Sequence, residues 1–137
     1  MDLKLELIII PVSDVDRAKD FYVNSLNFDV EMDMQLNEHM RVARLIPPGS
    51  RCGIAIGTGL TDARPGSAKG MHLMVTDVVE VGSELTRHHV DFHGPYHFVN
   101  GEAVEGLSPT RAPFDSFLDF ADPDGNLWMV QEVPAEN

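Results

Sequence analysis

Five of the six histidines lie in the second half of the chain, and they are the side chains best suited to acid–base or metal chemistry. His89, His93 and His97 are spaced as two His-x3-His pairs, with His88 adjacent to the first. His89 and His93 straddle the predicted break between a helix and a strand, so the geometry that sets residues i and i+4 side by side does not apply. We therefore interpret this group as polar residues near a helix C-terminus, where cations are favoured, and not as a metal site.

His72 is the main catalytic candidate, because it lies within a short apolar strand and its imidazole titrates near neutral pH. It could remove a proton from an activated carbon or hydroxyl as a general base. Gln131 is a second candidate, which would orient that imidazole or a ligand carbonyl. The alternative for both is a structural pair, with a core histidine bonded to the carboxamide. Cys52, the only cysteine, is interpreted as a small buried apolar residue, since no His–Cys spacing supports a nucleophile.

The composition of the chain limits the classes of partner that it can bind. The chain has 137 residues, of which 43% are hydrophobic, so it can form a single domain with a real core. A net charge of −12 argues against nucleic acid or an anionic membrane as partner. No apolar run is long enough to span a bilayer, and the N-terminus lacks the features of a signal peptide. With one cysteine and hence no internal disulfide, we expect a cytoplasmic protein.

The elements that position these residues form an internal repeat. A shift of 63 positions aligns Val12–Val15 with Val75–Val78, and each of these segments follows an apolar strand and begins an amphipathic helix. Two copies of strand-helix-strand-strand-strand are the simplest account. We predict one domain, 1–137, made of a first module at 1–58, a linker at 59–69 and a second module at 70–137. The connection Gly94–Asp115 is long, so it either forms a lid or contains a further strand.

Two motifs then resemble a known family. Leu7–Tyr22, followed by Leu26–Phe28, is similar to the opening signature of the vicinal oxygen chelate superfamily, which includes glyoxalase I, bleomycin-resistance proteins and extradiol dioxygenases. Asp122–Asn126, a Pro-Asp-Gly turn before the last strand, is similar to its closing signature. The resemblance implies an α+β fold of two βαβββ modules, the glyoxalase/bleomycin resistance/dihydroxybiphenyl dioxygenase fold. It further implies that the curved mixed sheets form a cup and that the protein is a homodimer.

The enzymes of this superfamily hold a divalent metal with four inward side chains, usually His and Glu. The resemblance assigns those positions to residues without an expected donor: Leu7, Ile54, Gly70 and Met129. We therefore predict no metal and no cofactor. Because alternate strand residues share a face, a second set joins them in the cup: Ile9, Ile56, His72 and Gln131. A mostly apolar floor of this kind suits a small hydrophobic or aromatic molecule.

Three functions remain open from the sequence. The leading hypothesis is a metal-independent protein that sequesters such a molecule or acts on it with His72. The alternative is a metal-dependent lyase, isomerase or dioxygenase whose displaced site uses His72 and the loop histidines. The third is a non-catalytic subunit whose cup is filled by its own side chains. Tyr96, Phe98 and Phe114 either form an aromatic wall over the cup or pin the long loop.

Overall fold

A computed structural model describes residues 1–135. The chain divides into two compact units, each considered by itself. The first comprises Met1–Ala68 together with Asp122–Asn126, and the second comprises Lys69–Ala121 together with the chain from Leu127 onward. Neither of the two α-helices among these residues has the length and apolar composition needed to cross a bilayer.

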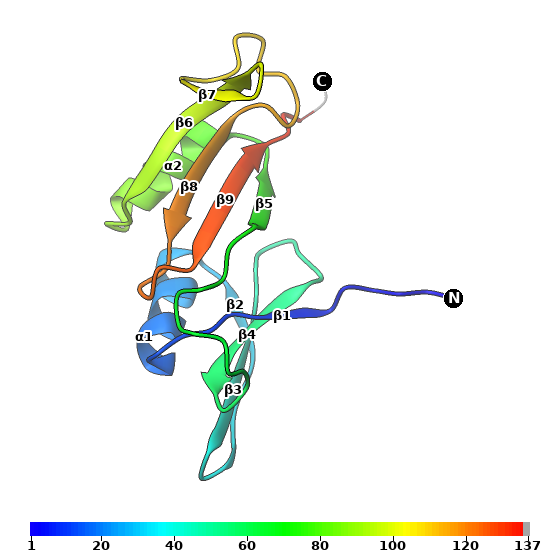
Figure 1. The fold of residues 1–137 in the computed structure, drawn as a ribbon, viewed down its shortest axis with the longest axis vertical. Coiled ribbons are helices and arrows are strands. Elements are labelled where there is room, and N and C mark those ends of the chain that lie inside the picture. The colour runs from blue at the N-terminus through cyan, green and yellow to red at the C-terminus, as the bar shows by residue number, and fades with distance from the viewer. Residues whose placement is uncertain (136–137) are drawn as a thin grey trace. The chain divides into compact units, whose positions relative to one another are not determined.

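The first unit is a four-stranded mixed sheet with one helical segment (Figure 1). Strand order is β1-β4-β3-β2, with β1 parallel to β4 and the other pairs antiparallel. In chain order the elements are β1 (Leu7–Ile9), α1 (Val15–Asp20), the π-helix η1 (Phe21–Ser25), β2 (Asp29–Asn37), β3 (Met40–Ile46) and β4 (Gly53–Thr58).

Helix α1 starts where the sequence predicted and covers one face of this sheet. Asp14 is its N-cap, and the Asp14 carboxylate accepts a hydrogen bond from the backbone N–H of Arg17 at 3.0 Å. Asp16 of α1 lies 2.9 Å from Arg41, and Lys19 lies 2.7 Å from Asp33. Side chains of β2 and β3 that share the face of Arg41 and Asp33 therefore point towards α1.

Ile54 and Ile56 also point towards α1, which corrects the sequence prediction. Ile54 pairs with Leu45 of β3 and Ile56 with Ala43, and all four side chains are buried. The face of Leu7 and Ile9 is the opposite one, because these residues pair with Gly53 and Ala55. The prediction was wrong by one residue in β4, since it aligned two turns of different length, Pro48-Gly49 with Asp122–Gly125.

The turn Asp122–Asn126 connects β8 (Phe117–Ala121) and β9 (Leu127–Glu132) in the chain, yet it belongs to the first unit by its contacts. The Tyr22 hydroxyl donates to Asp122 Oδ2 at 2.7 Å, and the Ser13 hydroxyl donates to Asp124 Oδ1 at 2.5 Å. Asn126 Nδ2 donates to the carbonyl of Pro11 at 2.8 Å. The opening and closing motifs of the sequence thus bond to each other.

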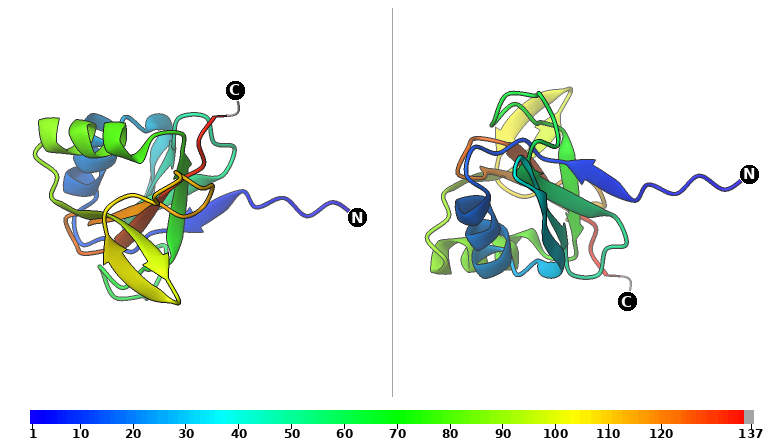
Figure 2. Two further views of the ribbon diagram at one scale, coloured as in Figure 1. Left: turned by 90° about the horizontal axis from the view of Figure 1, so that it is seen from above. Right: turned by 90° about the horizontal axis from the view of Figure 1, so that it is seen from below.

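The second unit is a five-stranded mixed sheet in the order β5-β9-β8-β6-β7, with β5 parallel to β9. Helix α2 lies along one face of β6, β8 and β9 (Figures 1 and 2). In chain order the elements of the second unit are β5 (Met71–Val75), α2 (Val78–Arg87), β6 (Phe92–Val99), β7 (Glu102–Glu105), β8 (Phe117–Ala121) and β9 (Leu127–Glu132). The predicted α+β class is confirmed. The long connection holds strand structure, and β7 is an addition to the repeated pattern.

Candidate functional site

The face of the second sheet that α2 does not cover carries a group of aromatic and polar side chains. Trp128, Val130 and Glu132 of β9 are buried on the α2 side, so Met129 and Gln131 point to the other side. Cross-strand pairing extends that side over β5, β6 and β8. We call it the open face and define it by these residues: His72, Met74, His93, Tyr96, Phe98, Phe117, Asp119, Met129 and Gln131.

The two catalytic candidates from the sequence both lie on the open face. His72 pairs with Met129, and His72 Nδ1 lies 3.4 Å from Gln131 Oε1. Gly70 stands just before β5 with a φ of +86°. Leu7 and Ile9 belong to the first unit, on the sheet face away from α1, where they are 36% and 41% exposed. Participation of any of these residues in binding or catalysis stays a prediction.

Asp119 organises a polar cluster that the sequence reasoning missed. Its Oδ2 accepts a hydrogen bond from the Tyr96 hydroxyl at 2.9 Å and lies 3.3 Å from His93 Nδ1. Burial raises the pKa of the Tyr96 phenol, and the nearby Asp119 carboxylate raises it further, so Tyr96 remains a donor at neutral pH. The carboxylate favours the His93 tautomer protonated at Nδ1, which leaves Nε2 as an acceptor.

An aromatic cluster adjoins these polar groups. The Tyr96 ring stacks near Phe117 with ring centres 5.9 Å apart, and Phe98 contacts both edge-on at 5.8 and 5.3 Å. The His93 ring lies 5.0 Å from Tyr96. Phe114, the third member of the predicted aromatic wall, lies in a loop with a φ of +63° and is 57% exposed. Of the three rings, Phe98 is 42% exposed, whereas Tyr96 and Phe117 are 6% and 9% exposed, so Phe98 is the main accessible part of this aromatic platform, which has hydrogen-bonding groups beside it.

The histidines with metal-like spacing do not come together. His88 caps the C-terminus of α2, and His89 leaves the helix with a φ of +60°. His93 lies on the open face, whereas His97 is buried on the other side and its Nδ1 lies 2.7 Å from the carbonyl of Gly106.

The positions that the resemblance assigns to a metal do not fit one. Leu7, Gly70 and Ile54 offer no donor atom, and Met129 offers only a thioether. Across residues 1–135, no group of three or more His, Cys, Asp or Glu side chains is arranged to hold a metal ion. On the open face, His93 and Asp119 approach each other as a pair without a third such ligand.

Glu132 lies on the other side of the sheet and anchors the long loop. Its side chain is fully buried, and its Oε2 accepts the backbone N–H of Val78 at the start of α2, at 2.9 Å. Arg111 donates from Nε to Oε1 at 2.7 Å and from Nη2 to Oε2. The Arg111 guanidinium lowers the pKa of the Glu132 carboxyl. This ion pair joins the loop, the helix start and the last strand.

We expect Glu132→Gln to lower stability at neutral pH by about 1–3 kcal/mol, because the charge-assisted bonds to Arg111 are lost. Since the folded-state pKa of Glu132 is lowered, its stabilisation is present above the unfolded pKa of about 4.3 and is lost as pH falls below that value. Urea unfolding measured between pH 7 and pH 3 should therefore show a smaller decrease in unfolding free energy for the variant than for wild type. Glu80→Gln, at an exposed position in the first turn of α2, is the control. An equal decrease in unfolding free energy on acidification in wild type and Glu132→Gln would contradict this account.

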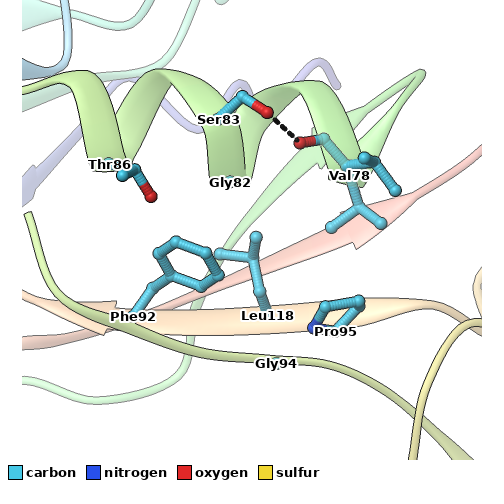
Figure 3. Close-up of a pocket in the computed structure, with 9 residues that line it drawn as sticks. Val78, Gly82, Ser83, Thr86, Phe92, Gly94, Pro95 and Leu118 are labelled. Carbon is cyan, nitrogen blue, oxygen red and sulfur yellow. Dashed lines mark hydrogen bonds between the residues drawn. The ribbon is translucent and has the colours of Figure 1, made fainter.

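A hollow of about 420 Å³ lies between α2 and the sheet, away from the open face (Figure 3). Val78 from the helix and Phe92 and Leu118 from the strands point into it (Figure 3). Ser83 Oγ, at its edge, donates to the carbonyl of Val79 at 3.2 Å. The full lining is Val78, Val79, Gly82, Ser83, Thr86, Phe92, Gly94, Pro95 and Leu118. None of these side chains titrates, so the hollow offers no acid–base group.

Comparison with known proteins assigns the family. The family model of the Glyoxalase/Bleomycin resistance protein/Dioxygenase superfamily matches residues 4–130. The chain belongs to this superfamily. The resemblance noted in the opening and closing motifs is thereby confirmed. A search of curated proteins found no match.

Several solved structures share the fold over nearly the whole chain. One is TnmS3, an antibiotic binding protein from Streptomyces sp. CB03234, with 28% identity, a TM-score of 0.77 and 98% coverage of both chains. Another is a superfamily member from Sphaerobacter thermophilus DSM 20745, with 30% identity, a TM-score of 0.77 and coverage of 96% of this chain and 98% of that one. A glyoxalase/bleomycin resistance protein from Streptomyces sp. CB03234 has 29% identity, a TM-score of 0.73 and coverage of 94% and 100%. The predicted glyoxalase/bleomycin resistance fold is confirmed.

Proposed function

We propose that this protein binds a small hydrophobic or aromatic molecule on the open face of its second sheet, without a metal. The observation that carries the proposal is the aromatic platform of Tyr96, Phe98 and Phe117, with Phe98 as its exposed ring, on a face that α2 leaves uncovered. Flat apolar ligands stack on such rings, and a few polar groups at the edge fix their orientation. TnmS3, an antibiotic binding protein of similar fold and 28% identity, supports a binding role.

The polar groups around the platform support a ligand that also forms hydrogen bonds. His72 and Gln131 lie along one side, and His93 and Asp119 along another. Met129, between them in the sheet, adds a polarizable side chain that adapts to ligands of different shape. A metal plays no part in the proposal, because the ligand positions of the superfamily carry residues that do not fit one.

Calorimetric titration with 2-naphthol, a small bicyclic aromatic alcohol, tests the proposal. We expect saturable binding with one site per chain and a negative heat-capacity change, unaltered by EDTA. At 100 times its Kd, the ligand should raise the unfolding free energy by about 2.7 kcal/mol. Absence of saturable binding by 2-naphthol and by related neutral aromatics would refute the function. Recovery of unchanged ligand after long incubation would identify a binder, and conversion lost in His72→Ala would identify a metal-independent enzyme.

We further propose that the protein acts as a homodimer in the cytoplasm. Leu7 and Ile9, exposed in the first unit, give a second copy apolar surface to cover. The single cysteine, Cys52, is compatible with a reducing compartment. Light scattering after gel filtration should give twice the chain mass of 15.2 kDa, and a single-chain mass at micromolar concentration would exclude the dimer.

A further inference from the structure

We propose that the open face selects aromatic ligands that carry an acidic hydroxyl group, and that His93 Nε2 accepts the hydrogen bond, and then the proton, of that hydroxyl. This inference rests on the proposed function, because it names the ligand class for the same site. It starts from the side chains that meet at Asp119, which are brought together from β6 and β8.

The Asp119 carboxylate determines what His93 can do. Its Oδ2 accepts a hydrogen bond from the Tyr96 hydroxyl at 2.9 Å and lies 3.3 Å from His93 Nδ1. With Nδ1 protonated towards Asp119, Nε2 carries the free lone pair. The His93 side chain is 74% exposed, so that nitrogen is accessible to a ligand.

The proton transfer is balanced within this group. The ligand O–H bond breaks, its electron pair stays on the ligand oxygen, and a new N–H bond forms at His93 Nε2. The products are a phenolate and an imidazolium beside the Asp119 carboxylate, so no oxidant, reductant or further reactant is needed. The Tyr96 hydroxyl donates to Asp119, and its neutral phenol oxygen is a much weaker base than the imidazole, so the proton goes to His93.

The platform favours a hydroxyl attached directly to an aromatic ring. The His93 ring lies 5.0 Å from Tyr96, and Tyr96 stacks near Phe117 at 5.9 Å. A ligand ring lying on this cluster would hold its hydroxyl rigidly at the edge next to His93, at little cost in conformational entropy. The titratable residues facing the site from all strands of the sheet are His72, His93, Tyr96, Glu105 and Asp119.

Two probes that differ at one group test the inference: p-nitrophenol and its methyl ether p-nitroanisole. We expect wild type to bind p-nitrophenol at least about tenfold more tightly than p-nitroanisole, a difference of about 1.4 kcal/mol. At a pH about one unit below the probe's own pKa, bound p-nitrophenol should show the yellow absorbance of the phenolate. His93→Asn and Asp119→Asn should each reduce the preference to about threefold or less and abolish the yellow bound species.

Saturable binding of p-nitroanisole by each variant shows that the platform is intact, and the ratio of the two affinities within one variant makes the loss specific to the hydroxyl. Val99→Ala, on the opposite face of β6, should leave both affinities and the absorbance unchanged. Equal affinity of wild type for the two probes, or a preference that survives in His93→Asn, would overturn the inference and leave the proposed function standing. If neither probe binds wild type while 2-naphthol does, the inference fails and the proposed function stands; if 2-naphthol does not bind either, both fail.

Discussion

Asp122→Ala is expected to lower the free energy of unfolding by about 3–5 kcal/mol, the largest stability effect of any single substitution considered. The carboxylate is buried, and it accepts hydrogen bonds from the Tyr22 hydroxyl at 2.7 Å and from Asn126 Nδ2 at 2.8 Å. It also accepts the backbone N–H groups of Asp124 and Asn126, at 3.0 and 2.9 Å. Alanine would leave buried donors without partners, and the protein would lose a large part of a typical total stability of about 5–15 kcal/mol.

Guanidinium unfolding followed by far-ultraviolet circular dichroism measures this loss. Tyr22→Phe removes a single donor and should cost about 1–2 kcal/mol, since the other bonds of Asp122 remain. Asp20→Ala is the matched control, because Asp20 is exposed and its side chain bonds only locally, to Asn24; it should change stability by less than about 0.5 kcal/mol. A loss below about 1 kcal/mol in Asp122→Ala would show that the turn does not stabilise the first unit.

Phe98→Ala is expected to weaken binding of 2-naphthol by about 10- to 100-fold, the largest effect on binding. Phe98 contributes edge contacts to both Tyr96 and Phe117, and burying an aromatic ring against a ligand contributes about 1.5–3 kcal/mol. The backbone N–H of Phe98, which lies 3.4 Å from Asp115 Oδ1, is unaffected by the substitution. Calorimetric titration of the variant and of wild type measures the change in Kd.

The adjacent residue gives a matched control for this experiment. Phe98 is 42% exposed and Val99 is 47% exposed, and the two point to opposite faces of β6. Val99→Ala should therefore leave the Kd of 2-naphthol unchanged within about twofold. Equal loss of affinity in both variants would indicate a general loss of structure, and equal retention would place the ligand away from the platform.

The opening and closing motifs were sufficient to predict the fold, because the residues that define them bond to each other. Ser13 reaches Asp124, and Tyr22 reaches Asp122. Such bonds restrict residue types at fixed positions, so they leave a pattern that can be recognised in one sequence. The register of β4 left no such pattern. Its residues are small or apolar on both faces, and the face of Ile54 could not be decided from their types.

The polar cluster of the open face was missed for two physical reasons. The irregularity in pairing between His93 and Tyr96, around Gly94 and Pro95, brings both residues to one face, whereas regular alternation would place residues three apart on opposite faces. Asp119 lies in an apolar strand, where a single acidic residue gives no sign of its partners. β7 did leave a usable signal, since Asn100 and the glycine after it, both with positive φ, form the Asn-Gly turn typical of a hairpin.

The most direct test of the central claim is the methyl spectrum of the protein labelled with ¹³C at its seven methionines, recorded with and without 2-naphthol. Met129 lies on the open face, with its sulfur 3.0 Å from the Tyr96 hydroxyl. Met71 is buried on the α2 side of the sheet, where it is the cross-strand neighbour of Trp128. Ring currents from a ligand on the platform should shift the Met129 methyl most and leave Met71 in place. A shift of Met71 with Met129 unmoved would contradict the proposed binding face.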